Sequence, residues 1–131
     1  MAANTITQRT LVGVGSDRNI YRLIHLVSVD GTEETDTVIY DNSTLVANVL
    51  KGSLKQVWLS GNSCTVRLEW DQSTDSIAFQ GDPINGGHWD FRGFGGIVNP
   101  GATGATGDLV MTTGGLDTGD EFWLIIHIVQ D

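Results

Sequence analysis

His88 and Asp90, in the string GGHWDF, are the two residues whose types and spacing come nearest to a chemical site. A separation of two places both side chains on one face of a strand. An imidazole and a carboxylate there could bind a metal ion or act as an acid–base pair. The chain has only three histidines, and no other ligand residues cluster nearby. The sequence therefore favours a loop histidine beside the start of a strand over a metal or catalytic site.

Motifs of other enzyme classes are missing from the sequence. It has no G-x-S-x-G elbow, no H-E-x-x-H motif and no G-x-x-x-x-G-K phosphate loop. The string GFGG at 93–96 leads into IVNPG and not into a helix, so it predicts a bend or bulge and not an anion site. Aspartates in DNS, GDP and two TGD strings lack the spacing of a calcium loop and are expected to be solvated turn residues. We therefore expect no enzyme and no cofactor.

Charge and cysteine content argue against several classes of partner. The chain has 16 acidic and 7 basic residues, a formal charge of −9, and the basic residues are scattered. Neither nucleic acid nor an anionic membrane is therefore an expected partner. Cys64 is the only cysteine, which excludes an intrachain disulfide and a thiolate metal cluster. The opening string MAANTITQRT lacks a secretory pattern, and no apolar run is long enough to span a bilayer.

Four tryptophans raise the alternative of sugar binding, because indole rings on an open sheet can stack against sugar rings. Trp70 belongs to an alternating apolar set and is expected in the core. Trp58 falls on the face opposite Val57 and Leu59, and Trp89 lies near a loop. Trp58 and Trp89 are thus the candidates for exposure. Burial in the core or in a subunit contact is favoured over sugar binding.

The elements that must position these residues are strands. In CTVRLEWD, Val66, Leu68 and Trp70 alternate with polar residues, which is the pattern of a half-buried strand. The string IYRLIHLVSV at 20–29 is apolar on both alternating faces, which indicates a strand covered on both sides. Further strands are predicted in TDTVIYD, LKQVWLS and DLVMTT.

Turn signals such as Asp30-Gly31 and Asn99-Pro100-Gly101 recur between these strands. Turn signals at such regular spacing predict a single all-β domain over residues 1–131, an antiparallel sandwich of about eight strands. The string NSTLVANVLKG is the one candidate for a short helix, with an irregular strand as the alternative. Residues 1–10 are expected to form either an ordered strand or an N-terminal arm.

The string DEFWLIIHIVQ is apolar on both sides of one strand. The two faces are Phe122, Leu124, Ile126 and Ile128 on one side and Trp123, Ile125, His127 and Val129 on the other. In a two-layer sandwich one side of a strand normally meets solvent. We therefore predict that the Trp123 side is buried by a long loop or by another subunit. His127, and His25 on the earlier two-faced strand, are expected to be neutral, hydrogen-bonded residues rather than pH switches.

Several strings together resemble small structural proteins of tailed bacteriophages, including cyanophages. They are R-L-x-W-D-x-x-T-D from Arg67, D-F-R-x-F-G-G-I-x-N-P from Asp90, T-G-D-L from Thr106 and G-D-E-F-x-L-I-I from Gly119. The resemblance covers most of residues 36–129 and is closest in type to the capsid decoration, or cement, proteins. It implies a jelly-roll-like β-sandwich without catalytic residues.

The resemblance implies a virion component that bridges neighbouring subunits of the major capsid protein on the outer capsid surface. Such a protein would form a dimer or trimer with itself and would be made in the cytoplasm of the bacterial host, where a lone cysteine stays reduced. The alternative is an adhesin or carbohydrate-binding module on a tail or baseplate. That module would use exposed aromatic side chains and loops rich in Gly and Asp.

Overall fold

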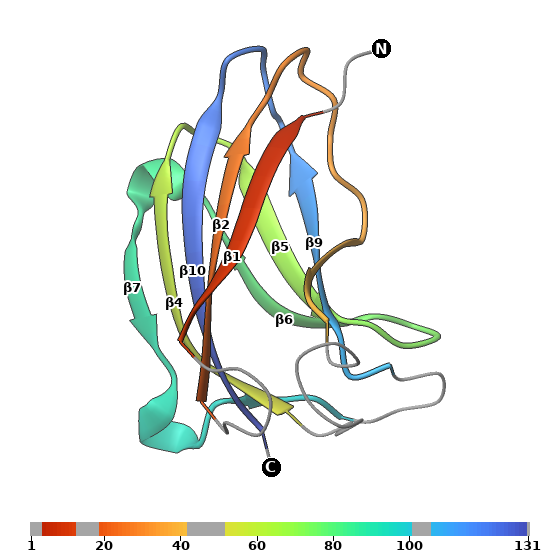
Figure 1. Cartoon of the computed structure of the whole chain (residues 1–131), viewed down its shortest axis with the longest axis vertical. Coiled ribbons are helices and arrows are strands. Elements are labelled where there is room, and N and C mark those ends of the chain that lie inside the picture. The colour runs from red at the N-terminus through yellow and green to blue at the C-terminus, as the bar shows by residue number, and fades with distance from the viewer. Residues whose placement is uncertain (1–3, 13–18, 42–51, 101–105, 131) are drawn as a thin grey trace.

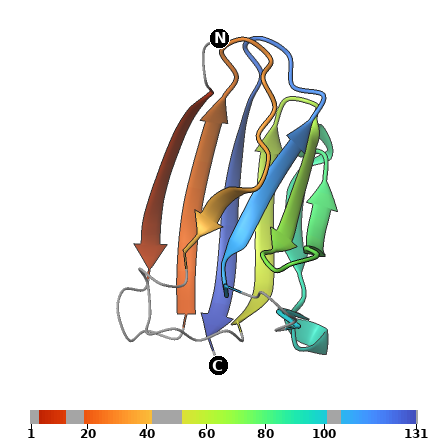
Figure 2. The same cartoon turned by 90° about the vertical axis from the view of Figure 1, so that its right-hand side faces the viewer.

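Two antiparallel β-sheets pack face to face in the computed structural model of the chain (Figure 1). The structure describes residues 4–12, 19–41, 52–100 and 106–130. Sheet A contains, in order, β1 (Thr5–Val12), β2 (Asn19–Val27), β10 (Glu121–Gln130), β4 (Gly52–Gly61) and β7 (Gly87–Asp90), with β8 (Ile97–Val98) also paired to β4. Sheet B contains β3 (Thr37–Tyr40), β9 (Leu109–Gly114), β5 (Thr65–Trp70) and β6 (Ser76–Gly81). Figure 2 shows the two layers side by side, and the predicted all-β sandwich is confirmed.

The described residues form ten strands, slightly more than the sequence predicted. Two single-turn 3₁₀ helices, η1 (Pro83–Asn85) and η2 (Arg92–Phe94), flank β7, and the described part of the chain contains no α-helix. The helix predicted in the string NSTLVANVLKG falls on residues 42–51, outside the described residues, except that Gly52 opens β4. None of the helices in the described ranges is long and apolar enough to cross a membrane.

The segment from Thr5 to Val12 is the edge strand of sheet A and not a free arm. It pairs with β2 in antiparallel register, from Thr5 opposite Val27 to Thr10 opposite Arg22. Its alternating polar residues suit an edge strand, which meets water along its open side. The strand alternative for the N-terminal segment is thus the one that the structure shows, and residues 1–3 lie outside the described part.

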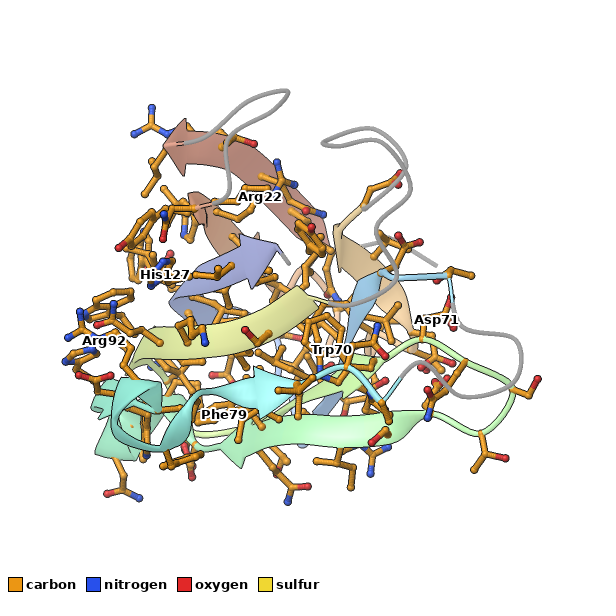
Figure 3. The ribbon with its side chains drawn as sticks, turned by 90° about the horizontal axis from the view of Figure 1, so that it is seen from below. Arg22, Trp70, Asp71, Phe79, Arg92 and His127 are labelled. Atoms are coloured by element: carbon orange, nitrogen blue, oxygen red, sulfur yellow. The ribbon has the colours of Figure 1, made fainter. Side chains whose placement is uncertain are left out.

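The core lies between the sheets and is built from the inward positions of alternating strands. All four inward residues of β10, from Phe122 to Ile128, are fully buried. On β5, Val66, Leu68 and Trp70 are fully buried, as predicted. Of the three residues expected to face water, Thr65 is exposed, Arg67 is half-buried and Glu69 is buried, with its carboxylate accepting a hydrogen bond from Arg67 Nε at 3.2 Å. Trp70 lies between the two layers in Figure 3 and is among the largest fully buried side chains.

Arg22 interrupts the apolar pattern of β2 because its guanidinium joins three strands. Its Nε donates to the Ile39 carbonyl of β3 at 3.1 Å, across the sandwich. Its two terminal nitrogens donate to Thr10 Oγ1 at 2.9 Å and Gln8 Oε1 at 2.8 Å, both on β1. Burial lowers the pKa of Arg22, and the charge of Asp41 opposes that effect. The arginine therefore links the edge strand of sheet A to sheet B.

Candidate interaction site

Six ring side chains on the outer side of sheet A form three stacked pairs. Tyr21 stacks on His127, His25 on Trp123 and Trp58 on His88, with ring centroids 4.2, 4.5 and 4.6 Å apart and interplanar angles of 6°, 6° and 2°. We call these six residues the aromatic face. All three histidines of the chain belong to it. Figure 3 shows His127 on this side of the molecule, away from Trp70.

The register of the strands produces these pairs. Because successive residues point to opposite sides of a sheet, burial of Phe122 and Leu124 in the core turns Trp123 outward. Trp123 then lies directly opposite His25 of β2. Side chains directly opposite each other in an antiparallel pair have Cβ atoms about 4.5–5.5 Å apart, which suits stacking of flat rings. The same relation holds for the other two pairs.

Four polar side chains form a hydrogen-bonded chain across the aromatic face. His127 Nε2 lies 2.9 Å from Asn19 Oδ1, and His127 Nδ1 lies 3.0 Å from Gln56 Nε2. His88 Nε2 lies 2.7 Å from Gln56 Oε1. Because an amide nitrogen donates and an amide oxygen accepts, His127 Nδ1 is the acceptor here, while His127 Nε2 and His88 Nε2 carry protons. In this arrangement His127 is neutral.

The surroundings of His127 also favour its neutral form. Its side chain is buried, with 5% of the residue exposed. Desolvation lowers its pKa, and the positive charges of Arg92 and Lys55 lower it further. His25, the other histidine predicted to be hydrogen-bonded, lies 3.0 Å from Glu121 Oε2. Both histidines are therefore partnered, as the sequence predicted.

The four residues predicted to form an interface differ in exposure. Trp123 is 43% exposed, Ile125 and Val129 are half-buried, and His127 is buried. The ring of Trp123 stacks on His25 of the neighbouring strand, and this contact leaves 43% of the residue exposed. The predicted cover by another subunit stays a prediction.

Two hollows border Trp58 on the aromatic face. The larger, of about 580 Å³, lies between Trp58 and Trp123, with Ile125 and His88 in its lining and η1 at its rim. The smaller, of about 320 Å³, is lined by Leu11, Tyr21, Trp58 and Ile125. The larger volume is within the range of small-ligand sites, which are typically lined by apolar and aromatic groups with a few polar atoms. The face can therefore accept either a protein side chain or a small polar ring.

His88 and Asp90 point to the same side of β7, as their spacing predicts, but they do not form a pair. The Asp90 carboxylate accepts hydrogen bonds from the Arg92 side chain at 2.9 and 2.8 Å and from its backbone N–H at 2.9 Å. These bonds hold the pKa of Asp90 well below its usual range. His88 instead stacks on Trp58 and contacts Gln56. The two residues therefore act separately and are not assigned as metal ligands.

Trp89, a candidate for exposure, instead packs against the core, which is one of the alternatives that the sequence favoured over sugar binding. Trp89 lies opposite Val57 in the pairing of β7 with β4, so it faces the interior. Its ring packs edge-on against Phe79, with centroids 5.0 Å apart. Trp58 faces outward and Trp70 is fully buried, both as predicted. The indoles available to a partner are therefore Trp58 and Trp123.

The remaining residues considered for chemistry have structural surroundings. Burial raises the pKa of the Cys64 thiol to about 11, so it stays protonated at neutral pH. Asp82 accepts hydrogen bonds from the backbone N–H groups of Cys64 and Ile84, which makes it a turn residue as predicted. Gly95 and Gly96, with φ of 91° and 87°, form the predicted bend. In the described ranges, one group, Asp36, Glu69 and Asp75, has the spacing of metal ligands, and it contains no histidine or cysteine.

The ring partners of Trp123 and His127 were missed by the sequence analysis. A signal for them exists: Trp123 and His127 are four residues apart, and so are Tyr21 and His25. Two antiparallel strands paired in the right register bring both rings of one strand onto both rings of the other. The spacing alone does not identify which two strands pair.

Comparison with known proteins adds no relative. No protein-family model matches the chain, and no match is found among curated proteins.

Proposed function

We propose that the chain is a structural protein of a bacteriophage virion, a capsid decoration protein that uses its aromatic face to bind other proteins. Its partners would be further copies of itself, in a dimer or trimer, and the major capsid protein on the outer surface of the head. The observation that supports this proposal is the exposure of Trp123. It is 43% exposed on a face of stacked rings, although the residues on the inner side of the same strand are fully buried. Apolar patches exposed on folded domains usually mark interaction sites.

The connectivity of the strands supports the jelly-roll winding that the resemblance implies. Without β1 and β8, sheet A runs β2-β10-β4-β7 and sheet B runs β3-β9-β5-β6. Most connections cross from one sheet to the other, so strands adjacent in sequence, such as β2 and β3, lie in different layers. Two four-stranded sheets joined in this manner are the arrangement of jelly rolls, which build many viral capsid and lectin domains.

The energetics of such docking are favourable for a flat face of rings. Covering apolar surface is worth about 25 cal/mol per Å², before the entropic cost of association. Stacked rings are held in place before binding, so they lose little further freedom. The formal charge of −9 suits display on an outer surface, because it keeps copies of the chain from associating nonspecifically in solution.

Changing Trp123 to serine is expected to weaken binding to emptied phage heads by about tenfold or more, because aromatic anchors dominate interface energies. Cosedimentation with the heads measures binding, and light scattering measures the subunit number. Ile77→Ser is the matched control, since Ile77 is 57% exposed but belongs to β6 of sheet B. Equal losses from both variants, or no binding by the unaltered chain, would contradict the proposal.

Electron microscopy of particles lacking this protein tests where it acts. We expect heads of normal shape with unoccupied positions on the outer shell. Particles that are tailless or have blunt tails would instead place the protein in the tail and favour the adhesin alternative.

A carbohydrate-binding module is the second candidate function, and the hollow between Trp58 and Trp123 favours it. A sugar ring there could stack on an indole while its hydroxyls reach polar groups at the rim. If this function holds, Trp58→Ala abolishes binding on a glycan array. Phe94→Ala, which removes a ring that is 68% exposed outside the hollow, leaves binding unchanged. An array without any bound glycan would reject this candidate.

A further inference from the structure

The side-chain amide of Gln56 is held between two imidazole rings of the aromatic face. Its oxygen lies 2.7 Å from His88 Nε2, and its nitrogen lies 3.0 Å from His127 Nδ1. Gln56 is 4% exposed, so water has little access to the amide. Both imidazoles are also fixed by stacking, His127 on Tyr21 and His88 on Trp58.

We infer that Gln56 allows only one of His88 and His127 to be protonated at a time. An imidazolium donates from both ring nitrogens, whereas an amide offers one accepting oxygen and one donating nitrogen. In the observed orientation, His88 can gain a proton and keep its hydrogen bond to the amide oxygen. A proton on His127 Nδ1 would instead face the amide N–H groups.

Rotation of the amide does not remove this restriction. It would turn the Gln56 oxygen toward a charged His127, but it would also turn the nitrogen toward His88. His88 would then have to be neutral and accept through Nε2. Neither orientation gives both charged rings an acceptor on Gln56. The cost falls mainly on His127, because His127 is buried and a buried donor without an acceptor is unfavourable, whereas His88 is exposed on β7.

Other charges around the two rings modify the restriction without replacing it. Among the described residues, the titratable and charged groups facing the rings are Lys55 on β4, Asp90 on β7, Arg92 on η2 and Tyr21 on β2. His25 and Glu121, whose side chains lie 3.0 Å apart, are on the same side of sheet A. Asp90 attracts a proton, but its oxygens are engaged by Arg92 at 2.8 and 2.9 Å. Lys55 and Arg92 repel a proton from His127.

The restriction limits how the aromatic face responds to acid, and its effect on docking rests on the proposed function. A charged His88 stacked on Trp58 gains cation–π attraction. A second charge on buried His127 would be attracted by Asp90, but the Asp90 oxygens already accept hydrogen bonds from Arg92. These two rings therefore add at most one charge in mild acid, which preserves the binding of an apolar partner surface.

Imidazole ¹⁵N NMR of the isolated chain, from about pH 8 to pH 5, tests the inference directly. In His88→Ala the protonation midpoint of His127 is expected to rise by about one pH unit, because the Gln56 amide becomes free to turn. A rise caused by relief of simple charge repulsion would shrink in about 1 M salt to the extent that solvent reaches the two rings, whereas a rise caused by the freed amide should not. Gln56→Glu should also raise the His127 midpoint by about one unit or more, because a carboxylate accepts from both rings.

An unchanged His127 midpoint in His88→Ala, or a rise that disappears in high salt, would overturn the inference. The His127 midpoint in Gln56→Glu provides a second measurement if His88→Ala folds poorly. The titration is measured on the isolated chain, without capsids. A negative titration result therefore does not contradict the proposed docking, and a negative docking result does not contradict the inference about Gln56.

Discussion

Replacing Trp70 with alanine is expected to lower the free energy of unfolding by about 3–5 kcal/mol. Trp70 is fully buried on β5, and its removal leaves a cavity between the sheets that the surrounding strands cannot close. Because domains of this kind are stable by only about 5–15 kcal/mol, the loss is a large fraction of the total. Urea unfolding followed by circular dichroism measures it as a lower midpoint.

Trp123→Ala is the matched control for this prediction, because it removes the same side chain from the outer side of sheet A. Trp123 is 43% exposed, and its main ring contact is the stack with His25. We expect a loss of about 1 kcal/mol or less, the size of one aromatic pair. Similar losses for both variants would show that Trp123 serves the fold itself, and the argument for docking through it would fail.

The strands were predictable because alternation of apolar and polar residues is a local property of the sequence. It placed Trp70 in the core and Trp58 outside, and it put His88 and Asp90 on one side of a strand. Each of these predictions requires only knowledge of which residues of a single strand point to the same side of the sheet. All three are found in the structure.

The side of the sheet on which Trp89 lies could not be predicted from its own strand. It lies in a strand of only four residues that begins at Gly87, so too few side chains are present to set the phase of the alternation. The pairing of β7 with β4 decides the matter by placing Trp89 opposite Val57 on the inner side. Proximity to a loop is therefore a weaker guide than register.

The stacked pairs of the aromatic face could not be predicted because they depend on pairing between distant strands. His25 and Trp123 are joined only when β10 enters sheet A between β2 and β4. Both sides of β10 are apolar for two different reasons. Phe122 and its alternates fill the core, while Trp123 and His127 stack on rings of β2, and Ile125 lines a hollow with Tyr21 and Trp58.

Gly86→Ala is expected to destabilise the protein by about 1–3 kcal/mol and to lift η1 from β4. A Cβ at this position would lie 2.1 Å from the Leu59 carbonyl oxygen and 2.6 Å from that of Pro83. Both obstacles are backbone atoms, so no side-chain rotation relieves the overlap. Leu59 is 2% exposed in the core, which leaves the η1 segment as the part that must move. Since η1 forms the rim of the larger hollow, the variant should also weaken binding at the aromatic face.

Gly93→Ala distinguishes this steric effect from a general effect of replacing glycine. Gly93 lies in η2, and a Cβ there would meet nothing within 4 Å. We therefore expect a change within about 0.5 kcal/mol, as for ordinary surface substitutions. Urea unfolding of both variants gives the two free energies, and amide NMR shifts show whether the changes in Gly86→Ala are confined to β4, η1 and β7. If Gly86→Ala were as stable as Gly93→Ala, η1 would not be seated on β4, and the hollow beside Trp58 would lose its rim.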